Sequence, residues 1–346
     1  MLRRDIVKKG IAVGGNMVVD YVKTIDSYPK QGNLSTIIAL SKSVGGAPPN
    51  VLLDLSKMDS GIPLKAIGLI GYDEDGEYIV SAFKKHNVDT TLIKRDSSLR
   101  TSFSDVMTVN STGARTFFHY RGTNQLLNIE HFDFNSIDAD IFHIGYALLL
   151  DALDSKDKEY GVVMARLLDK AQKNGLKTSL DVVSENSTRF SKIVPHSLRY
   201  CNYIIINEVE ASLTTGISIR DYQDILITEN MKLICERLFD MGVNDLVVIH
   251  APEGGFAMDN QRMLYMQGSL NLPDGYIKGT VGAGDAFCAG ILYSIYNGWN
   301  IPKTLQVAVS AAACCLSEVN ATDGMKDIEG IEKLYASMEK NNMLML

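Results

Sequence analysis

The sequence has few of the features that mark several large classes of protein. Its 346 residues include only 5 cysteines, with no C-x-x-C pair, and its 6 histidines form no H-E-x-x-H. Neither a disulfide scaffold nor a zinc site is indicated, and the cysteines are expected to be buried, reduced thiols. No apolar run reaches the 18 residues of a membrane-spanning helix, and glycines break the apolar stretch after the basic N-terminus. The protein is therefore expected to be cytoplasmic.

Positive charge is also scarce. Lys and Arg number 34 against 41 Asp and Glu, which gives a net charge of -7, so no basic excess is present to neutralise the phosphates of a nucleic acid. Only 8 prolines and 28 glycines occur, too few for a collagenous or broadly disordered chain. The 46% of hydrophobic residues can form a large core. The length allows either two folding units or one large α/β unit with an appendage.

Short apolar runs alternate with helical patterns along most of the chain. Strands are expected at 11–13, 65–70, 141–144, 178–183, 203–206 and 246–249, and helices at 51–58, 74–86, 160–173 and 230–241. This alternation predicts right-handed βαβ units, and hence a three-layer, Rossmann-like α/β fold with a mainly parallel sheet and helices on both faces.

Two segments interrupt the alternation. Residues 33–43 have β character without a helix of their own, and residues 101–120 have the pattern of a β-hairpin with polar turn residues. They predict a small antiparallel sheet, formed by about residues 16–43 and 100–121, that projects from a single α/β domain spanning 1–346. Such a sheet near the carboxyl ends of the strands could act as a lid.

The segment 279–290, GTVGAGDAFCAG, combines glycines with one acid at the start of a helical pattern. The free N–H groups of Gly282, Ala283 and Gly284 and the positive end of the helix dipole would form a cradle for an anion. Asp285 follows directly. Because a carboxylate repels phosphate, its position indicates a group that handles a proton on a neighbouring hydroxyl; a simple helix cap is the alternative.

Other polar residues follow the expected strands. Gly45 and Gly46 open the turn GGAPPN, and Asn50 offers both a donor and an acceptor for polyol hydroxyls. Asp20 follows the first strand and could accept hydrogen bonds from hydroxyls. For each of these the alternative is an ordinary turn or cap.

Asn207 and Glu210 follow the apolar strand at 203–206. Their oxygens, at the carboxyl end of a strand, suit Mg²⁺ and its waters. The alternative here is an ordinary helix N-terminus with favourable acids.

Together these motifs resemble the PfkB (ribokinase-like) carbohydrate kinase family, in the right order through almost the whole chain. Residues 45–50 resemble its first signature in the fructokinase-like form, and residues 70–76 resemble the strand-end motif that follows. Residues 207–210 resemble its Mg²⁺ and phosphate motif, and residues 282–287 its second signature. The resemblance implies that ATP phosphorylates a terminal hydroxyl of a pentose or hexose.

The resemblance also implies roles for individual residues. Asp285 would be the general base, and the amides of Gly282, Ala283 and Gly284 would stabilise the charge on the transferring phosphoryl group. The implied sugar contacts are Asp20, Gly45, Gly46 and Asn50, with Gly32 in the lid segment and Arg115 and Arg121 as surface charges or weaker contacts. The implied ATP contacts are Asn207, Glu210, Thr280 and Gly255, with Glu210 holding Mg²⁺ through water.

The chain departs from the family pattern at several positions. Gly279 stands where the family usually has an aspartate that helps to order a monovalent-cation site, so activation by K⁺ is not expected. Pro252 replaces a usual glycine beside the nucleotide, and His250 is expected to be a structural substitute for threonine. The strand end Asp181-Val-Val-Ser184 lacks the frequent Asp-x-Asn.

Three alternatives remain open. A nucleoside kinase of the same fold is the nearest, and a sugar-binding relative without activity is supported only by Gly279. A dinucleotide-dependent oxidoreductase has the least support, because neither Gly14-Gly15 nor the 282–284 segment is completed by a third glycine. The expected partners are a small-molecule sugar and ATP, with no nucleic acid and no membrane; a homodimer through the lid is compatible with the pattern.

Overall fold

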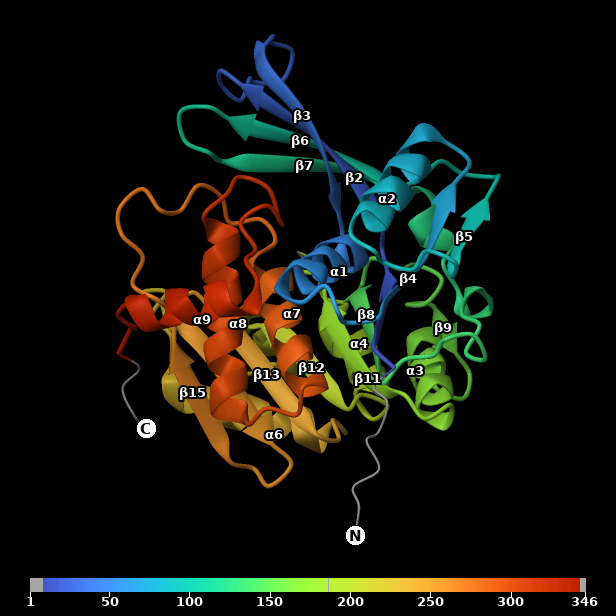
Figure 1. Cartoon of the computed structure of the whole chain (residues 1–346), viewed down its shortest axis with the longest axis vertical. Helices are drawn as coiled ribbons and strands as arrows, with labels where there is room; N and C mark the ends of the chain where they lie inside the picture. The colour runs from blue at the N-terminus through green and yellow to red at the C-terminus, as the bar shows by residue number, and fades with distance from the viewer. Residues whose placement is uncertain (1–8, 186, 343–346) are drawn as a thin grey trace.

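The body of the protein is built on one nine-stranded sheet (Figure 1). The computed structural model describes residues 9–185 and 187–342. The strands of this sheet are β1 (Ile11–Gly15), β4 (Leu64–Gly71), β5 (Ile93–Asp96), β8 (Ile141–Ala147), β11 (Lys177–Val182), β12 (Tyr203–Asn207), β13 (Leu246–Ala251), β14 (Gly254–Asp259) and β15 (Leu264–Gly268). They lie in the order β15-β14-β13-β12-β11-β8-β1-β4-β5, and only β14 and β15 run antiparallel to their neighbours.

Helices cover both faces of this sheet. One layer contains α1 (Ala47–Met58), α2 (Glu74–Lys85), α7 (Ala283–Tyr296), α8 (Ile301–Leu316) and α9 (Ile328–Ser337). The other contains α3 (Val163–Lys173), α4 (Phe190–Leu198), α5 (Glu208–Thr215) and α6 (Thr228–Asp240). Side chains of β1 alternate between two hydrophobic cores: Ile11 and Val13 pack with the first layer and Ala12 with the second. The predicted three-layer α/β fold is confirmed.

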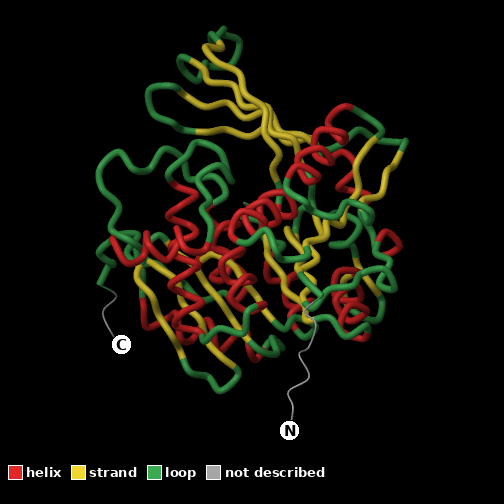
Figure 2. Tube along the Cα trace, in the orientation of Figure 1, coloured by secondary structure: helices red, strands yellow, loops and turns green. Residues whose placement is uncertain are grey.

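A second, four-stranded sheet projects from the body, and Figure 2 shows its strands standing clear of the helices. This lid sheet consists of β2 (Val18–Ile25), β3 (Ile37–Gly45), β6 (Phe103–Val109) and β7 (Arg115–Tyr120), in the order β3-β2-β6-β7. The prediction of an antiparallel sheet was wrong in one respect, because β2 and β6 pair in parallel. Both strands continue the chain outward from the carboxyl ends of parallel body strands, β1 and β5, so they run the same way.

Three helices begin at residues other than those expected; one of them, α6, starts at Thr228 rather than at residue 230. α1 starts at Ala47 rather than at residue 51, because Pro48 and Pro49 occupy its first turn, where a missing N–H breaks no helical hydrogen bond. α3 starts at Val163 rather than at residue 160. The residues before it form β10 (Gly161–Val162), which pairs with β9 (Lys156–Asp157).

Several elements were not predicted from the sequence, among them β5, β14, β15, α4, α8 and α9. Two short 3₁₀ helices, η1 (Gly122–Leu126) and η2 (Ile129–His131), lead from the lid sheet toward β8. All five cysteines are buried and free, as expected. Among the described residues, no helix is both long enough and apolar enough to cross a membrane.

Candidate active site

Asp285 lies in the first turn of α7, where the lid sheet meets the body, and is only 6% exposed. The Asn50 Nδ2 of α1 donates a hydrogen bond of 2.8 Å to its Oδ2, and the hydroxyl of Tyr146, at the end of β8, donates one of 2.5 Å to its Oδ1. Burial raises the pKa of Asp285 to about 6, while these two hydrogen bonds act in the opposite direction. The carboxyl group is therefore largely ionised at neutral pH and can accept a proton.

The predicted anion cradle is present at the start of α7. Gly282 is the N-cap residue, with a φ of 84°, and a Cβ there would lie 2.5 Å from the Cβ of Ala321. Both the left-handed backbone and the close approach require glycine. Ala283 and Gly284 are the first residues of the helix, so their N–H groups have no intrahelical partner. The N–H of Ala283 makes one long hydrogen bond, of 3.4 Å, to the carbonyl oxygen of Thr280, whereas that of Gly284 donates to no atom of the described residues. The cradle thus presents backbone donors directly beside Asp285.

A cavity of about 660 Å³ opens beside this cradle, a size suited to a nucleotide. Its polar wall includes Asn207, His250 and Thr280 together with Ala283 and Gly284. Its apolar wall includes Leu270, Leu272, Ile277, Val309 and Leu316. The cavity could therefore hold a nucleotide, with its flat purine base against the apolar wall and its phosphates at the N-terminus of α7.

One predicted nucleotide contact is placed differently. Gly254 lines the cavity, and Gly255 does not. The ring of Phe287 fills the space beside Gly255, where a Cβ would lie 2.9 Å from the ring. Gly255 faces the layer of α7 and α8, but the Phe287 ring, which itself lines the cavity, covers it.

Asn207 and Glu210 form a reciprocal helix cap at the start of α5. The Asn207 Oδ1 accepts from the N–H of Glu210 at 2.8 Å, and the Glu210 Oε2 accepts from the N–H of Asn207 at 3.0 Å. The Ser184 hydroxyl donates to Glu210 Oε1 at 2.7 Å. The capping role that sequence left as an alternative is therefore present, and Asn207 also lines the nucleotide-sized cavity.

Glu210 of this cap and two further residues, Asp181 and Asp285, carry buried carboxyl groups whose charges interact. Burial raises the pKa of Glu210 to about 7, and it raises that of Asp181 well above its usual range, with Glu210 and Asp285 adding to the effect. No three His, Cys, Asp or Glu side chains of residues 9–185 and 187–342 are placed to hold a metal ion directly. This surplus of acid groups fits a divalent cation bound through water better than one bound by side chains alone.

Asp20 lies in β2 against the end of β3. A side chain at Gly45 would collide with its carboxylate, and one at Gly46, whose φ is 89°, would collide with the carbonyl oxygen of Asn16. Burial raises the pKa of Asp20 to about 6, opposed by a hydrogen bond with Ser104 and the charge of Arg115. The structure thus places Asp20 against Gly45, while Gly46 lies against Asn16.

The lid-strand arginines have different partners. The Arg115 Nη2 donates to the carbonyl oxygen of Val319, at 2.9 Å, and so joins β7 to the loop after α8. Arg121 pairs instead with Asp151, at 2.8 Å. Gly32 has no atom within 4 Å of its open side. Of these residues only Arg115 lies beside the candidate site.

Residues 6–328 match the family described as pfkB family carbohydrate kinase. The chain belongs to this family. It is therefore an ATP-dependent carbohydrate kinase.

Known relatives cover most of this kinase. It is 25% identical over 303 residues to a 5-dehydro-2-deoxygluconokinase of Geobacillus thermodenitrificans, which covers 86% of this chain and 85% of the relative. It is 26% identical over 334 residues to probable fructokinase-7 of Arabidopsis thaliana, covering 93% and 91%. The solved ribokinase of Arabidopsis thaliana, complexed with ribose and ATP, shares the fold with a TM-score of 0.76 and 20% identity, over 95% and 99% of the two chains.

The kinase has no room for an acid at Gly279. A Cβ there would lie 2.8 Å from the carbonyl oxygen of Val319. Beside it, the Cys315 thiol donates to the carbonyl oxygens of Val281, at 3.3 Å, and Ala321, at 3.1 Å. Backbone oxygens of the two loops that flank the cradle are thus joined by a thiol.

Tyr146, Asp54 and Arg220 were missed by sequence reasoning. Tyr146 lies at the carboxyl end of an apolar strand, and in a parallel sheet this position indicates a site residue. Asp54 lies one turn after Asn50 on α1, fully buried, and its carboxyl oxygens have no hydrogen-bond partner among the described residues. An acid in the apolar stripe of a helix was its only signal. Arg220 lies in a loop with no motif.

Arg220 connects two segments at the rim of the nucleotide-sized cavity. Its guanidinium donates to Glu208 Oε1 at 2.9 Å and to both carboxylate oxygens of Glu253, at 2.9 and 3.1 Å. Glu208 opens α5, and Glu253 lies in the turn between β13 and β14 beside Pro252. The bidentate pair fixes the position of that turn.

Proposed function

We propose that this kinase transfers the γ-phosphoryl group of ATP to a terminal hydroxyl of a five- or six-carbon sugar or sugar acid, with Asp285 as the general base. The observation that carries the proposal is a buried, ionisable carboxyl group directly beside the N–H groups of Ala283 and Gly284. A base and an anion cradle at this separation match a reaction in which a hydroxyl loses its proton as it attacks a phosphoryl group.

The proton path is short. The acceptor hydroxyl donates its hydrogen to Asp285 while its oxygen attacks the phosphorus atom, and ADP leaves with the bond electrons. The N–H groups of Gly282, Ala283 and Gly284 stabilise the negative charge on the phosphoryl oxygens during this step. His250 lies against Gly284, and burial lowers its pKa to about 4, so it is neutral and adds no charge.

Asp20, Gly45, Gly46 and Asn50 are proposed to hold the sugar. Asp20 accepts hydrogen bonds from hydroxyls, and the two glycines let the substrate approach the backbone closely. Asn50 already binds Asp285, so it also orients the base. The names of the relatives include both a sugar acid and a neutral sugar as substrates, and Arg115 supplies one cationic group near Asp20.

ATP is proposed to occupy the 660 Å³ cavity, with contacts from Asn207, Thr280 and Gly254. Asp181 and Glu210 would hold Mg²⁺ through water, as their raised pKa values and shared burial suggest. When bound, Mg²⁺ neutralises charge on the phosphates. The lid sheet is proposed to cover the sugar and exclude water, with Arg115 and Val319 as its contact to the body.

The decisive experiment is a coupled ADP-release assay with fructose, ribose, 2-keto-3-deoxygluconate, 5-dehydro-2-deoxygluconate and adenosine. Activity with a sugar or sugar acid is expected. Activity with adenosine alone would instead identify a nucleoside kinase, and no ADP release with any acceptor would favour a sugar-binding relative without activity.

Asp285→Asn tests the general base. It removes the base but keeps the shape, so kcat is expected to fall about 10³-fold, while ATP and sugar still bind in calorimetry. Unchanged turnover in this variant would exclude Asp285 as the base.

A further inference from the structure

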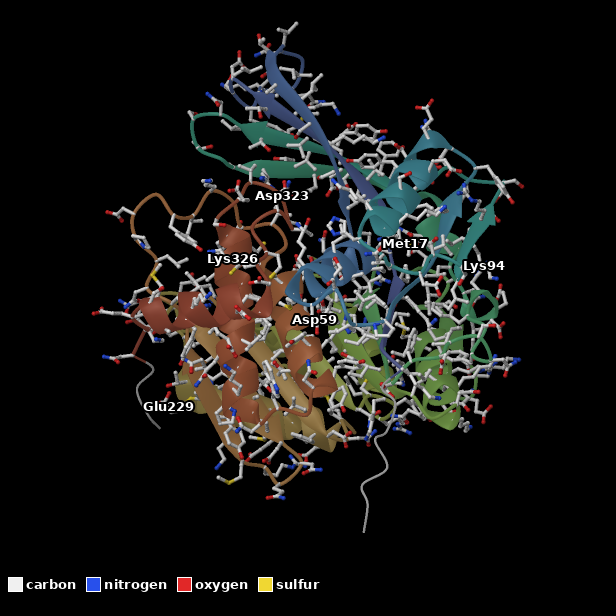
Figure 3. The ribbon with its side chains drawn as sticks, viewed as in Figure 1. Met17, Asp59, Lys94, Glu229, Asp323 and Lys326 are labelled. Carbon is white, nitrogen blue, oxygen red and sulfur yellow. The ribbon has the colours of Figure 1, made fainter. Side chains whose placement is uncertain are left out.

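A second cavity, of about 410 Å³, lies between α1, α2, the end of β3 and the loop at residues 320–323. None of the candidate catalytic residues lines it. Figure 3 shows Asp323, an acid of its wall, beneath the strands of the lid sheet. The polar side chains of its wall that could donate to a ligand include Lys42, Lys57, Tyr78, Ser81, Lys85 and His86. Three lysines thus surround one cavity, although the net charge of the whole chain is -7.

The three lysines differ in how far their charge is compensated. The Lys42 ammonium lies 2.9 Å from Asp75, so this charge is paired. The Lys57 ammonium donates to the carbonyl oxygen of Thr322 at 2.7 Å, and it lies 3.9 Å from Asp323, whose side chain is 65% exposed. The side chain of Lys85, which is exposed, forms no hydrogen bond or salt bridge with the described part of the chain. Lys85 therefore remains available to an anion, and the charge of Lys57 is compensated only by the exposed carboxylate of Asp323 at 3.9 Å among the described residues.

Asp54 does not cancel these charges in full. It lies one turn before Lys57 on α1. Two effects, burial and the charge of Asp285, raise its pKa well above the usual range, while the charge of Lys57 opposes them. Both effects favour the neutral acid. The cavity thus keeps a positive potential although an acid lies behind it.

His86 completes the wall, and its hydrogen bonding fixes its tautomer. The Ser56 hydroxyl donates to the carbonyl oxygen of Leu53 at 2.7 Å, so it must accept from Nδ1 of His86 at 3.2 Å. In the neutral ring Nε2 then carries no proton. Burial, Lys57 and Lys85 lower the pKa of His86, opposed by Asp323. While no anion is bound, the positive charges of Lys57 and Lys85 therefore favour the neutral form of His86.

We propose that this cavity binds a phosphoryl or similar dianion, held by Lys57 and Lys85 with help from Ser81 and His86. Its volume exceeds that of one phosphate, so a small phosphate ester fits as well as the free ion. A bound dianion offsets the two ammonium charges and favours the protonated ring, whose Nε2 then becomes a donor. Binding and protonation of His86 are therefore linked, and each strengthens the other. This inference does not depend on the proposed function.

The site touches a loop that also borders the candidate active site. Ala321 packs against Gly282 of the anion cradle, and Val319 accepts the hydrogen bond from Arg115 of the lid sheet. A ligand held by Lys57 would lie against Thr322 of the same loop. The cavity is thus placed to stabilise the loop that separates it from the cradle.

The test follows the imidazole signal of His86 by NMR in the full-length protein, assigned by its loss in His86→Gln. Sulfate is the first probe, because it stays a dianion between pH 5 and 8 and any pH dependence then reports on the protein. Saturating sulfate is expected to raise the pKa of His86, and sulfate is expected to bind more tightly at pH 5.5 than at pH 8. An unchanged titration of His86 would overturn the proposal.

Two lysine variants on the same helix provide the matched control. Lys85→Gln removes the unpaired ammonium and is expected to weaken sulfate binding about tenfold, whereas Lys84→Gln, an exposed neighbour outside the cavity wall, leaves it unchanged. Equal effects of the two variants would overturn the proposal, because they would indicate non-specific attraction.

Further arms of the titration separate other sources of the signal. The affinities of inorganic phosphate and glycerol 3-phosphate are compared at pH 8. Tighter binding of the ester would indicate that the cavity also binds the organic group of a phosphate ester, and equal binding would indicate that it binds the free ion. Each measurement is repeated with saturating ADP. Loss of the His86 response in ADP would overturn the proposal, since the anion would then be bound in the nucleotide-sized cavity.

Discussion

The phenol of Tyr146 donates a hydrogen bond of 2.5 Å to Asp285, although 139 residues separate the two in the chain. Together with Asn50 it occupies one direction of approach to each carboxylate oxygen and stabilises the ionised form. Each oxygen retains a lone pair, so an acceptor hydroxyl can still bind. Tyr146 is thus a positioning residue that keeps the proposed base charged despite its burial.

Tyr146→Phe should move the acid limb of the rate profile upward. The pKa of Asp285, about 6 in the wild type, rises when a donor is lost, so the rate should fall about fivefold at pH 6 and little at pH 8. The measurement is kcat/KM against pH. Tyr222→Phe, at a fully exposed tyrosine, is the control. An acid limb at the same pH in both variants would show that Tyr146 does not act on the base.

Glu210→Gln should change both stability and the response to Mg²⁺. The pKa of Glu210 is raised to about 7 in the folded protein, so its ionisation costs stability as the pH rises from below 4.5 through 7. The glutamine cannot ionise. The variant should therefore unfold in urea with a free energy about 1–3 kcal/mol larger than the wild type at pH 8, and equal to it at pH 4.

The same pair of proteins tests the cation. Mg²⁺ should stabilise the wild type at pH 8 more than Glu210→Gln, because the carboxylate attracts the ion and the amide does not. The variant should also need more Mg²⁺ for half-maximal rate. Identical Mg²⁺ dependence in both proteins would remove Glu210 from the cation site.

The kinase should run equally well in KCl, NaCl and choline chloride at matched ionic strength. An acid at Gly279 would collide with Val319, and the Cys315 thiol joins backbone oxygens of the two flanking loops. The measurement is kcat with saturating ATP and sugar. Strong activation by K⁺ alone would contradict this expectation.

Arg220→Met should raise the KM for ATP about tenfold with little change in kcat. The reason is that the turn holding Glu253 and Pro252 loses its bidentate anchor, while Asp285 and the cradle remain in place. Arg220→Lys should recover part of the affinity, since one of the hydrogen bonds can form again. Arg237→Met, at an exposed arginine of α6, is the control. A fall in kcat with unchanged KM would indicate a different role.

Local patterns predicted much of the fold. The alternation of apolar runs and helical patterns predicted six parallel strands of the body sheet and several of its helices, because the period of a strand or a helix depends on near neighbours. It did not predict β5, β14 and β15. The same holds for the cradle, since a glycine cap and a helix start are local features. The start of α1 was missed because two prolines suggested a turn, although the first turn of a helix tolerates them.

The candidate site depends on contacts that no local pattern contains. Asn50 and Asp285 bond across 235 positions of the chain, and Tyr146 reaches the same carboxylate from a third element. The choice of Gly254 over Gly255 rests on where Phe287 packs.

The sequence by itself therefore determined the fold class, the motifs and the residue proposed as the general base. The tertiary structure decided which side chains surround that base and how strongly burial raises its pKa. Hydrogen bonds and desolvation between distant segments exist only once the layers have packed together.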